Sequence, residues 1–138
     1  MNFKKISTVL AMAALTTSIF AGCSAKSESA LKDGTYTATS EADERGYVSS
    51  IELTVEEGKI SAVKYDEKDA EGVSKLDLPE YNQKMEEVSG AKPTTAFPAL
   101  EESLIEKQDV AAVDTVTGAT KTSDSFKALA QEALESAK

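Results

Sequence analysis

A regular alternation of side chains across residues 47–65 limits what this chain can fold into more than any other feature of its sequence. The first half has the period of two that is typical of a strand with one buried face. That face is predicted to carry Tyr47, Ser49, Ile51, Leu53 and Val55. Glu57-Gly58 then supplies a tight turn into a returning strand over residues 59–65, so the pattern predicts a β-hairpin. On the returning strand, strict alternation divides four side chains between two faces: Ile60 and Ala62 on one, Val63 and Tyr65 on the other.

Segments on both sides of the hairpin predict one more strand and a first helix. Residues 34–40 alternate and are rich in Thr and Tyr, as expected of a strand. A helix is predicted after the charged residues 66–77, with Pro79 near its start and Gly90 as its stop. One face of this helix is expected to carry Leu78, Tyr81, Met85 and Val88.

The C-terminal third predicts two more helices and a short strand. A helix is expected over residues 97–108, with Thr95 as its cap and Pro98 in its first turn, followed by a strand over residues 110–113. The last segment is typical of an amphipathic helix, because its apolar residues recur at three- and four-residue intervals: Phe126, Leu129, Ala130, Ala133, Leu134 and Ala137. Together these elements predict an α+β fold, a small, largely antiparallel sheet with helices packed on one side.

The first 22 residues have the composition of an export signal. Lys4 and Lys5 precede an uncharged run of apolar and small residues that is too short to span a membrane easily. Phe20-Ala21-Gly22-Cys23 then resembles a bacterial lipobox, although a Cys that merely ends an ordinary signal peptide is an alternative. We therefore expect a cleaved lipoprotein signal peptide at 1–22, a lipidated Cys23 with a polar tether at 23–31, and a folded domain at 32–138.

Composition excludes several kinds of chemistry. The chain has no His and one Cys, so the usual zinc sites, dithiol couples, haem attachment and His-containing catalytic triads lack their residues. Without Lys4 and Lys5, 13 basic residues face 24 acidic ones, and the formal charge moves from -9 to -11, which disfavours nucleic acid as a partner. The acidic residues within 66–71 lack the spacing of a calcium loop and are predicted to be solvated. Redox activity would therefore require an acquired cofactor.

A polar segment precedes the last helix and runs Asp114-Thr115-Val116-Thr117-Gly118-Ala119-Thr120-Lys121-Thr122-Ser123. Gly118 can adopt a positive φ and Ala119 adds little bulk, so a partner could approach Thr120 closely. Thr122 or Ser123 is a suitable N-cap, and Asp124 would place negative charge in the first turn. Thr120 would then stand just before a helix N-terminus, which favours a phosphate. The alternative is an ordinary loop and helix cap.

Asp-x-x-Thr-Gly-Ala-Thr, from Asp114 to Thr120, resembles the flavinylation motif of the FMN-binding domain family. The resemblance implies that Thr120 is joined through its oxygen to the phosphate of FMN. It also implies a separate, magnesium-dependent flavin transferase that uses FAD as donor and recognises Asp114, Thr117, Gly118 and Ala119. A Thr hydroxyl needs activation by a base or metal, which a chain without His leaves to the transferase.

The resemblance extends from about Lys32 to the end of the chain. It is strongest to the extracellular electron-transfer lipoproteins of Gram-positive bacteria, at Tyr81-Asn82, Val88-Ser89-Gly90 and residues 106–109. The chain departs from many of those relatives in having one such domain and no Glu-Thr-Pro-Gly loop. Three aromatic residues are candidates to contact the flavin ring, although each is better explained as a core or strand-packing residue: Tyr36, Tyr47 and Phe97.

The predicted function is that of a lipid-anchored flavoprotein on the extracytoplasmic face of the cell membrane. It would relay electrons from a membrane quinone-linked dehydrogenase to extracellular acceptors or surface reductases, as a carrier rather than an enzyme with its own substrate. The alternative is a non-flavinylated surface lipoprotein that acts as a ligand-binding or adhesion module. The two hypotheses differ in whether Thr120 carries FMN.

Overall fold

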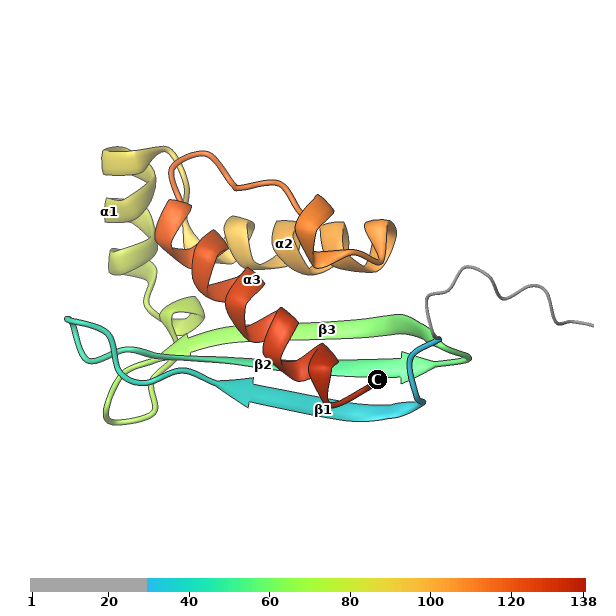
Figure 1. Ribbon diagram of the computed structural model, residues 1–138. Coiled ribbons are helices and arrows are strands. Elements are labelled where there is room, and N and C mark those ends of the chain that lie inside the picture. The colour runs from blue at the N-terminus through green and yellow to red at the C-terminus, as the bar shows by residue number, and fades with distance from the viewer. Residues whose placement is uncertain (1–29) are drawn as a thin grey trace, which may run out of the picture. The chain divides into compact units, whose positions relative to one another are not determined.

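The computed structural model describes residues 30–138, in which three antiparallel strands form one layer and helices lie over one face of it (Figure 1). The strands are β1 (Gly34–Thr39), β2 (Val48–Glu56) and β3 (Lys59–Lys68), in the spatial order β1-β2-β3. The α+β class predicted from the sequence is confirmed. The expected signal peptide, Cys23 and most of the tether lie outside the described residues.

The predicted hairpin is present, but a β-bulge changes which side chains of β3 are buried. Opposite Thr54 and Val55 the register jumps from Ala62 to Ile60, so Ser61 has no partner on β2. Because the extra residue reverses the alternation, Ile60 is buried on the same face as Val63, and Ala62 is exposed. The prediction that Ile60 and Ala62 share one face of the strand was therefore wrong, since strict alternation cannot reveal a bulge.

Five helical elements follow the sheet: the 3₁₀ turns η2 (Lys75–Asp77) and η3 (Val110–Ala112), and the α-helices α1 (Pro79–Ser89), α2 (Pro93–Lys107) and α3 (Thr120–Glu135). The strand predicted over residues 110–113 was wrong. The carboxylate of Asp109 accepts the Ala111 N–H at 3.0 Å and so closes a local turn there instead. No helix among residues 30–138 is long and apolar enough to cross a membrane.

Helix α2 begins four residues earlier than predicted, at Pro93. Proline suits the first position of a helix, where its missing N–H costs nothing. The next N–H, of Thr94, has no acceptor within the helix and donates to the buried Asn82 side chain at 3.1 Å. This start places Pro98 inside the helix and leaves Lys92, not Thr95, at the N-cap.

Helix α1 does not bury the face expected from its sequence. Tyr81 and Met85 are half-buried, Val88 is 74% exposed, and Asn82 is the buried residue. The Asn82 amide donates to the carbonyls of Lys75 and Leu78 at 2.7 and 2.8 Å, so it fastens η2 to the start of α1. A polar side chain with three hydrogen bonds thus holds this helix in place, a role that hydrophobic periodicity does not predict.

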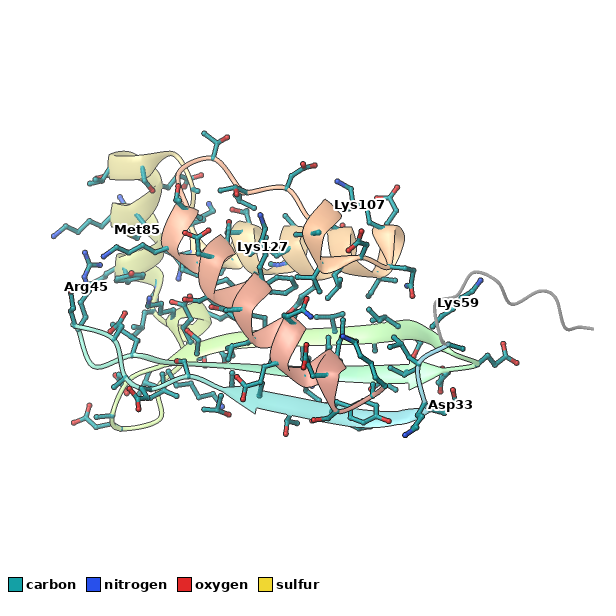
Figure 2. The ribbon with its side chains drawn as sticks, viewed as in Figure 1. Asp33, Arg45, Lys59, Met85, Lys107 and Lys127 are labelled. Atoms are coloured by element: carbon teal, nitrogen blue, oxygen red, sulfur yellow. The ribbon has the colours of Figure 1, made fainter. Side chains whose placement is uncertain are left out.

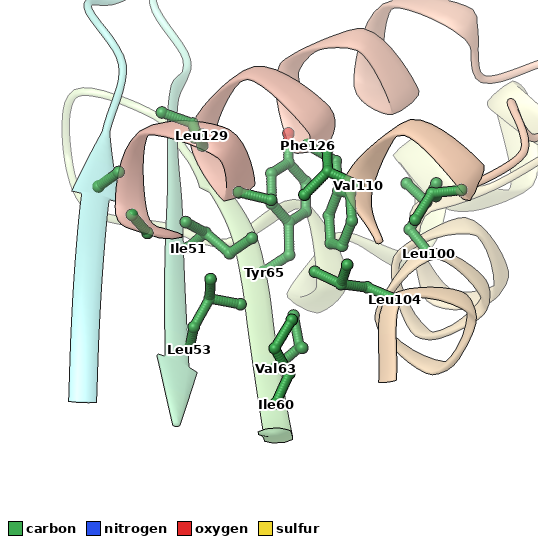
Figure 3. Close-up of a cluster of buried hydrophobic side chains, with 14 of the residues drawn as sticks. Ile51, Leu53, Ile60, Val63, Tyr65, Leu100, Leu104, Val110, Phe126 and Leu129 are labelled. Atoms are coloured by element: carbon green, nitrogen blue, oxygen red, sulfur yellow. The ribbon is translucent and has the colours of Figure 1, made fainter. Parts of the chain in front are cut away.

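The core lies between the sheet and helices α2 and α3, with Tyr65 at its centre (Figure 3). The Tyr65 ring meets Phe97 of α2 and Phe126 of α3 edge-on, with ring centroids 5.0 and 5.3 Å apart. Edge-to-face pairs of this kind are favourable beyond the area they bury. Leu53 and Leu104 are fully buried in the same cluster, so both helices are fixed to the sheet by one set of contacts.

Helix α2 also covers the edge of strand β3. Gln108 accepts the Ile60 N–H and donates to the Ile60 carbonyl, both at 2.8 Å, and Glu101 accepts the Tyr65 N–H at 2.7 Å. These side chains replace the missing neighbouring strand, which satisfies backbone groups that would otherwise be open to pairing with another chain. The helices therefore both fill the core and close one edge of the sheet.

Candidate functional site

The polar segment before α3 packs closely against the C-terminal end of α1. Gly118 has φ +88°, the positive value expected from the sequence. A Cβ added at Gly118 would lie 2.2 Å from the Ser89 carbonyl oxygen and 3.1 Å from Ala91 Cβ. Only a residue without a side chain fits there unless the turn around Gly90 moves. The glycine thus sets how near the segment comes to α1.

Thr120 is the first residue of α3, and its side chain is exposed. The N-cap is Ala119, so the prediction of Thr122 or Ser123 as the cap was wrong, and Asp124 falls beyond the first turn. The N–H groups of the first turn have no intrahelical partner, and among residues 30–138 no acceptor contacts those of Thr120 and Lys121. These donors and the helix dipole make the start of α3 suitable for a phosphate.

Ser123 has a different role from the predicted cap. It is completely buried; its hydroxyl donates to the Ala119 carbonyl at 2.8 Å and accepts the Val116 N–H at 3.0 Å. The side chain therefore ties the segment to the first turn of α3 from inside. Sequence reasoning recognised Ser123 as a hydroxyl near a helix start but could not tell a cap from this internal tie.

A cavity of about 820 Å³ opens beside Thr120. Its wall is formed by Gly118, Ala119 and Thr120 together with the loop before β2, the C-terminal end of β3, the start of η2, and the junction of α1 with α2. Apolar and aromatic side chains line part of it: Tyr81, Met85, Ala96 and Phe97. Polar and charged side chains line the rest. They include four basic residues, Arg45, Lys75, Lys92 and Lys121, and five acidic residues, Glu41, Asp43, Glu44, Glu67 and Asp124. Figure 2 shows Arg45 and Met85 at the same end of the sheet.

Asp114 and Thr117 lie on the outer side of the segment and do not line the cavity. The Asp114 carboxylate is 88% exposed and lies 2.7 Å from Lys107 Nζ, which also donates to the Ala112 carbonyl at 2.9 Å. The hydrogen bond and the charge of Lys107 lower the pKa of Asp114. The segment thus has two parts: residues 118–122 line the cavity, and Asp114 and Thr117 face solvent.

Comparison with known proteins identifies the family. The family model of the FMN-binding domain matches residues 46–135, which include the whole polar segment and the cavity-lining residues other than those at 40–45. This chain belongs to the FMN-binding domain family.

Individual relatives agree with that assignment. The chain is 40% identical over 111 residues to the "15 kDa lipoprotein" of Treponema pallidum, a match that covers 80% of this chain and 79% of the relative. It is similar to a crystal structure from Clostridium perfringens, with 43% identity, a TM-score of 0.75, and 78% and 88% of the two chains covered. A solution structure from Clostridium thermocellum matches at 28% identity and a TM-score of 0.54, covering 78% of this chain and 93% of that one.

The residues around the cavity fit the cofactor of the FMN-binding domain family. The volume of the cavity lies within the range of small-molecule sites. The free N–H groups at the start of α3, with Lys121 nearby, suit a phosphate. Tyr81 and Met85, both half-buried, offer aromatic and apolar surface of the kind that a flat ring requires. The donors and the apolar surface share one cavity, so both halves of FMN have matching partners there.

Of the three aromatic candidates, only Phe97 lines the cavity, and it is 1% exposed and packed in the core. Tyr36 lies elsewhere, half-buried with its hydroxyl bonded to the Lys32 carbonyl at 2.9 Å. Tyr47 does not line the cavity, and its ring centroid lies 6.2 Å from that of Tyr81. Sequence reasoning missed Tyr81 and Met85 because their helical spacing is also that of core residues.

Sequence reasoning also missed two charged residues in the cavity wall. Glu67 and Lys75 are 4% and 6% exposed and form a buried ion pair. Glu67 belongs to the acidic stretch that was expected to be solvated, and that expectation was wrong for this residue. Alternation along β3 directs its side chain inward after Val63 and Tyr65. Within residues 30–138 its ion-pair partner is Lys75, and no sequence pattern links the two.

Proposed function

We propose that this protein carries FMN joined to Thr120 through a phosphoester and relays electrons at the outer face of the cell membrane. The observation that carries the proposal is the position of Thr120, exposed at the first position of α3 and in the wall of the cavity. A hydroxyl placed there can hold a phosphate against the free N–H groups of the helix while the rest of the cofactor lies in the cavity. Membership of the FMN-binding domain family supplies the cofactor class.

Within this proposal, the chain's own residues divide the work of holding the cofactor. The first turn of α3 and Lys121 would offset the phosphate charge, and Tyr81 and Met85 would lie against the ring. FMN supplies the electron chemistry, and the protein supplies placement and local electrostatics. The donor would be a membrane quinone-linked dehydrogenase and the acceptors extracellular compounds or surface reductases, so the protein is an electron carrier rather than an enzyme with its own substrate.

Attachment would be the work of a flavin transferase with FAD and magnesium. Thr120 Oγ1 would form a bond to the FMN phosphorus of FAD as the bond to the AMP phosphate breaks, with AMP leaving and the hydroxyl proton passing to a base of the transferase. Among residues 30–138 no side chain hydrogen-bonds Thr120 Oγ1, which supports activation from outside the chain. Asp114 and Thr117, on the solvent side of the segment, are accessible for recognition.

The membrane anchor is proposed on Cys23, with its acyl chains holding the domain at the extracytoplasmic face. The name of the Treponema pallidum relative, "15 kDa lipoprotein", supports this part of the proposal. The signal peptide at 1–22 and a tether at 23–31 would then place the domain at 32–138 close to the bilayer surface. A formal charge of -9 for the whole chain suits a soluble domain that stays off an anionic membrane.

The decisive experiment measures the intact mass and in-gel flavin fluorescence of the protein made with and without a flavin transferase, FAD and magnesium. The test variant is Thr120→Ala. Its matched control is Thr94→Ala, because Thr94 is also an exposed threonine in the first turn of a helix. We expect one FMN that survives denaturation in the wild type and in Thr94→Ala, and none in Thr120→Ala.

Absence of added mass in the wild type, with a transferase that modifies a control substrate, would refute the proposal. The alternative of a non-flavinylated lipoprotein that binds a ligand or adheres to a surface would then stand. Modification that persists in Thr120→Ala would instead place the cofactor on another residue.

A further inference from the structure

The ion pair between Glu67 and Lys75 is the one buried charge pair of the described residues, and both members line the cavity beside Thr120. Glu67 lies near the end of β3, and Lys75 is the first residue of η2. Taking two charges out of water is costly, and apolar residues of the same volume often stabilise a fold equally well. Stability alone therefore gives little reason for a charged pair at this place.

The side-chain oxygens of Glu67 accept hydrogen bonds from three donors. One oxygen accepts the hydroxyls of Tyr65 and Thr122 at 2.8 and 3.0 Å, and the other accepts from Lys75. Burial raises the pKa of Tyr65, which keeps that hydroxyl a neutral donor. The Thr122 bond also joins this carboxylate to the first turn of α3, two residues from Thr120.

Lys75 is fixed and charged. Burial by itself would lower the pKa of Lys75, but the hydrogen bond and charge of Glu67 outweigh this and raise it. Its ammonium also lies 4.2 Å from the ring centroid of Tyr47 and 5.6 Å from that of Tyr81, distances at which the face of each ring attracts a cation. An ammonium has three donors, and one of them serves Glu67. Lys75 therefore holds a positive charge at a fixed position in the cavity wall, next to the Glu67 side chain that pairs with it.

We propose that Lys75 stabilises the negative charge that the flavin ring gains on reduction, and that Glu67 positions Lys75 for this role. The inference rests on the proposed function, because it requires the ring to occupy the cavity. Uptake of two electrons and one proton from a reductant turns the neutral ring into a monoanion, and a fixed cation nearby favours that form. Lys75 and Glu67 thereby set the reduction potential in opposite directions.

The test is a spectroscopic titration of the reduction potential, with dithionite as the reductant and dyes of known potential as references. The full chain is produced with a flavin transferase and purified in detergent, as wild type, Lys75→Met, Glu67→Gln and Lys64→Met. We expect Lys75→Met to weaken the preference for the reduced ring on the order of tenfold, which lowers the potential by about 30 mV for two electrons. Glu67→Gln removes the negative charge but keeps one side-chain oxygen that can accept from Lys75, so it should raise the potential.

Lys64→Met controls for net charge, because Lys64 is exposed on β3 and does not line the cavity; its potential should equal that of the wild type. Lys75→Arg keeps the positive charge and is the variant to use if Lys75→Met does not fold. The reduction potential of Lys75→Arg should stay nearest that of the wild type. Shifts of the same sign in Lys75→Met and Glu67→Gln, or none, would overturn the inference while leaving FMN in place. A wild type without covalent FMN would overturn the proposed function as well.

Discussion

Replacement of Gly118 by alanine tests whether the segment that presents Thr120 is held against α1. Two costs follow from the structure. Alanine at φ +88° costs about 1–2 kcal/mol, since L-residues avoid left-handed conformations. The new Cβ would also lie 2.2 Å from the Ser89 carbonyl oxygen, and overpacking of that kind costs about 1–3 kcal/mol. We expect Gly118→Ala to lower the free energy of unfolding by about 2–5 kcal/mol.

Gly72 provides a matched control, because it separates the two costs. Its φ of +85° is nearly that of Gly118, but no atom lies within 4 Å of a Cβ added there, and it does not line the cavity. Gly72→Ala should therefore lose only the backbone part, about 1–2 kcal/mol. The difference between the variants, about 1–3 kcal/mol, measures the contact with Ser89.

Urea denaturation followed by circular dichroism gives both free energies under one condition. Flavin transfer to the same variants shows whether the segment has moved, and we expect Gly118→Ala to accept FMN more slowly than Gly72→Ala. Equal losses of stability in the two variants would refute the reasoning, because the close approach of Gly118 to Ser89 would then contribute nothing.

Three further predictions follow from side chains that hold the site and the sheet. Ser123→Ala leaves the Val116 N–H without its partner and should cost about 1–3 kcal/mol in urea denaturation, more than Ser103→Ala on α2. Gln108→Ala removes the side chain that bonds the edge of β3 at Ile60, so it should lower the free energy of unfolding more than Gln131→Ala, whose amide bonds Glu135 on the surface of α3. Sedimentation should also show self-association of Gln108→Ala and none of Gln131→Ala. Because Lys107 lowers the pKa of Asp114, that carboxylate stabilises the fold above its unfolded pKa of about 3.9, and the benefit is lost as pH falls through the lower folded value. A stability difference between wild type and Asp114→Asn that persists at pH 2 would contradict this pairing.

The sequence predicts the sheet well because alternation reports burial directly. Ile51, Leu53 and Val55 follow the period of a half-buried strand, and all three are buried. The prediction fails where the period is broken by a single residue, at the bulge opposite Thr54 and Val55, since the pattern on either side of Ser61 is equally regular. It fails again at residues 110–113, where the Asp109 side chain outweighs β propensity.

Much of the candidate site lies beyond what a sequence pattern can show. The segment at 114–123 is found from local chemistry, because a glycine, a small residue and a hydroxyl before a helix have recognisable conformational preferences. The cavity wall is different, since Lys75, Tyr81 and Glu67 come from separate elements and meet only in the fold. From the sequence alone, the two charged residues are expected to be exposed and the tyrosine to lie in the core. Both expectations are reasonable as long as the neighbours of these residues in the fold are unknown.

The motif residues take on a physical meaning once the contacts around Thr120 are considered together. Three contacts hold the start of α3. Gly118 packs against the end of α1, the buried Ser123 hydroxyl accepts the Val116 N–H, and Thr122 donates to Glu67 near the end of β3. None of these contacts uses the Thr120 side chain, which stays exposed. Under the proposed function, a transferase must reach Thr120, and Thr120 must then hold the cofactor in one place. Both tasks need a fixed backbone and a free hydroxyl. The close packing at Gly118 supplies the first, and the position at the first turn of α3 supplies the second.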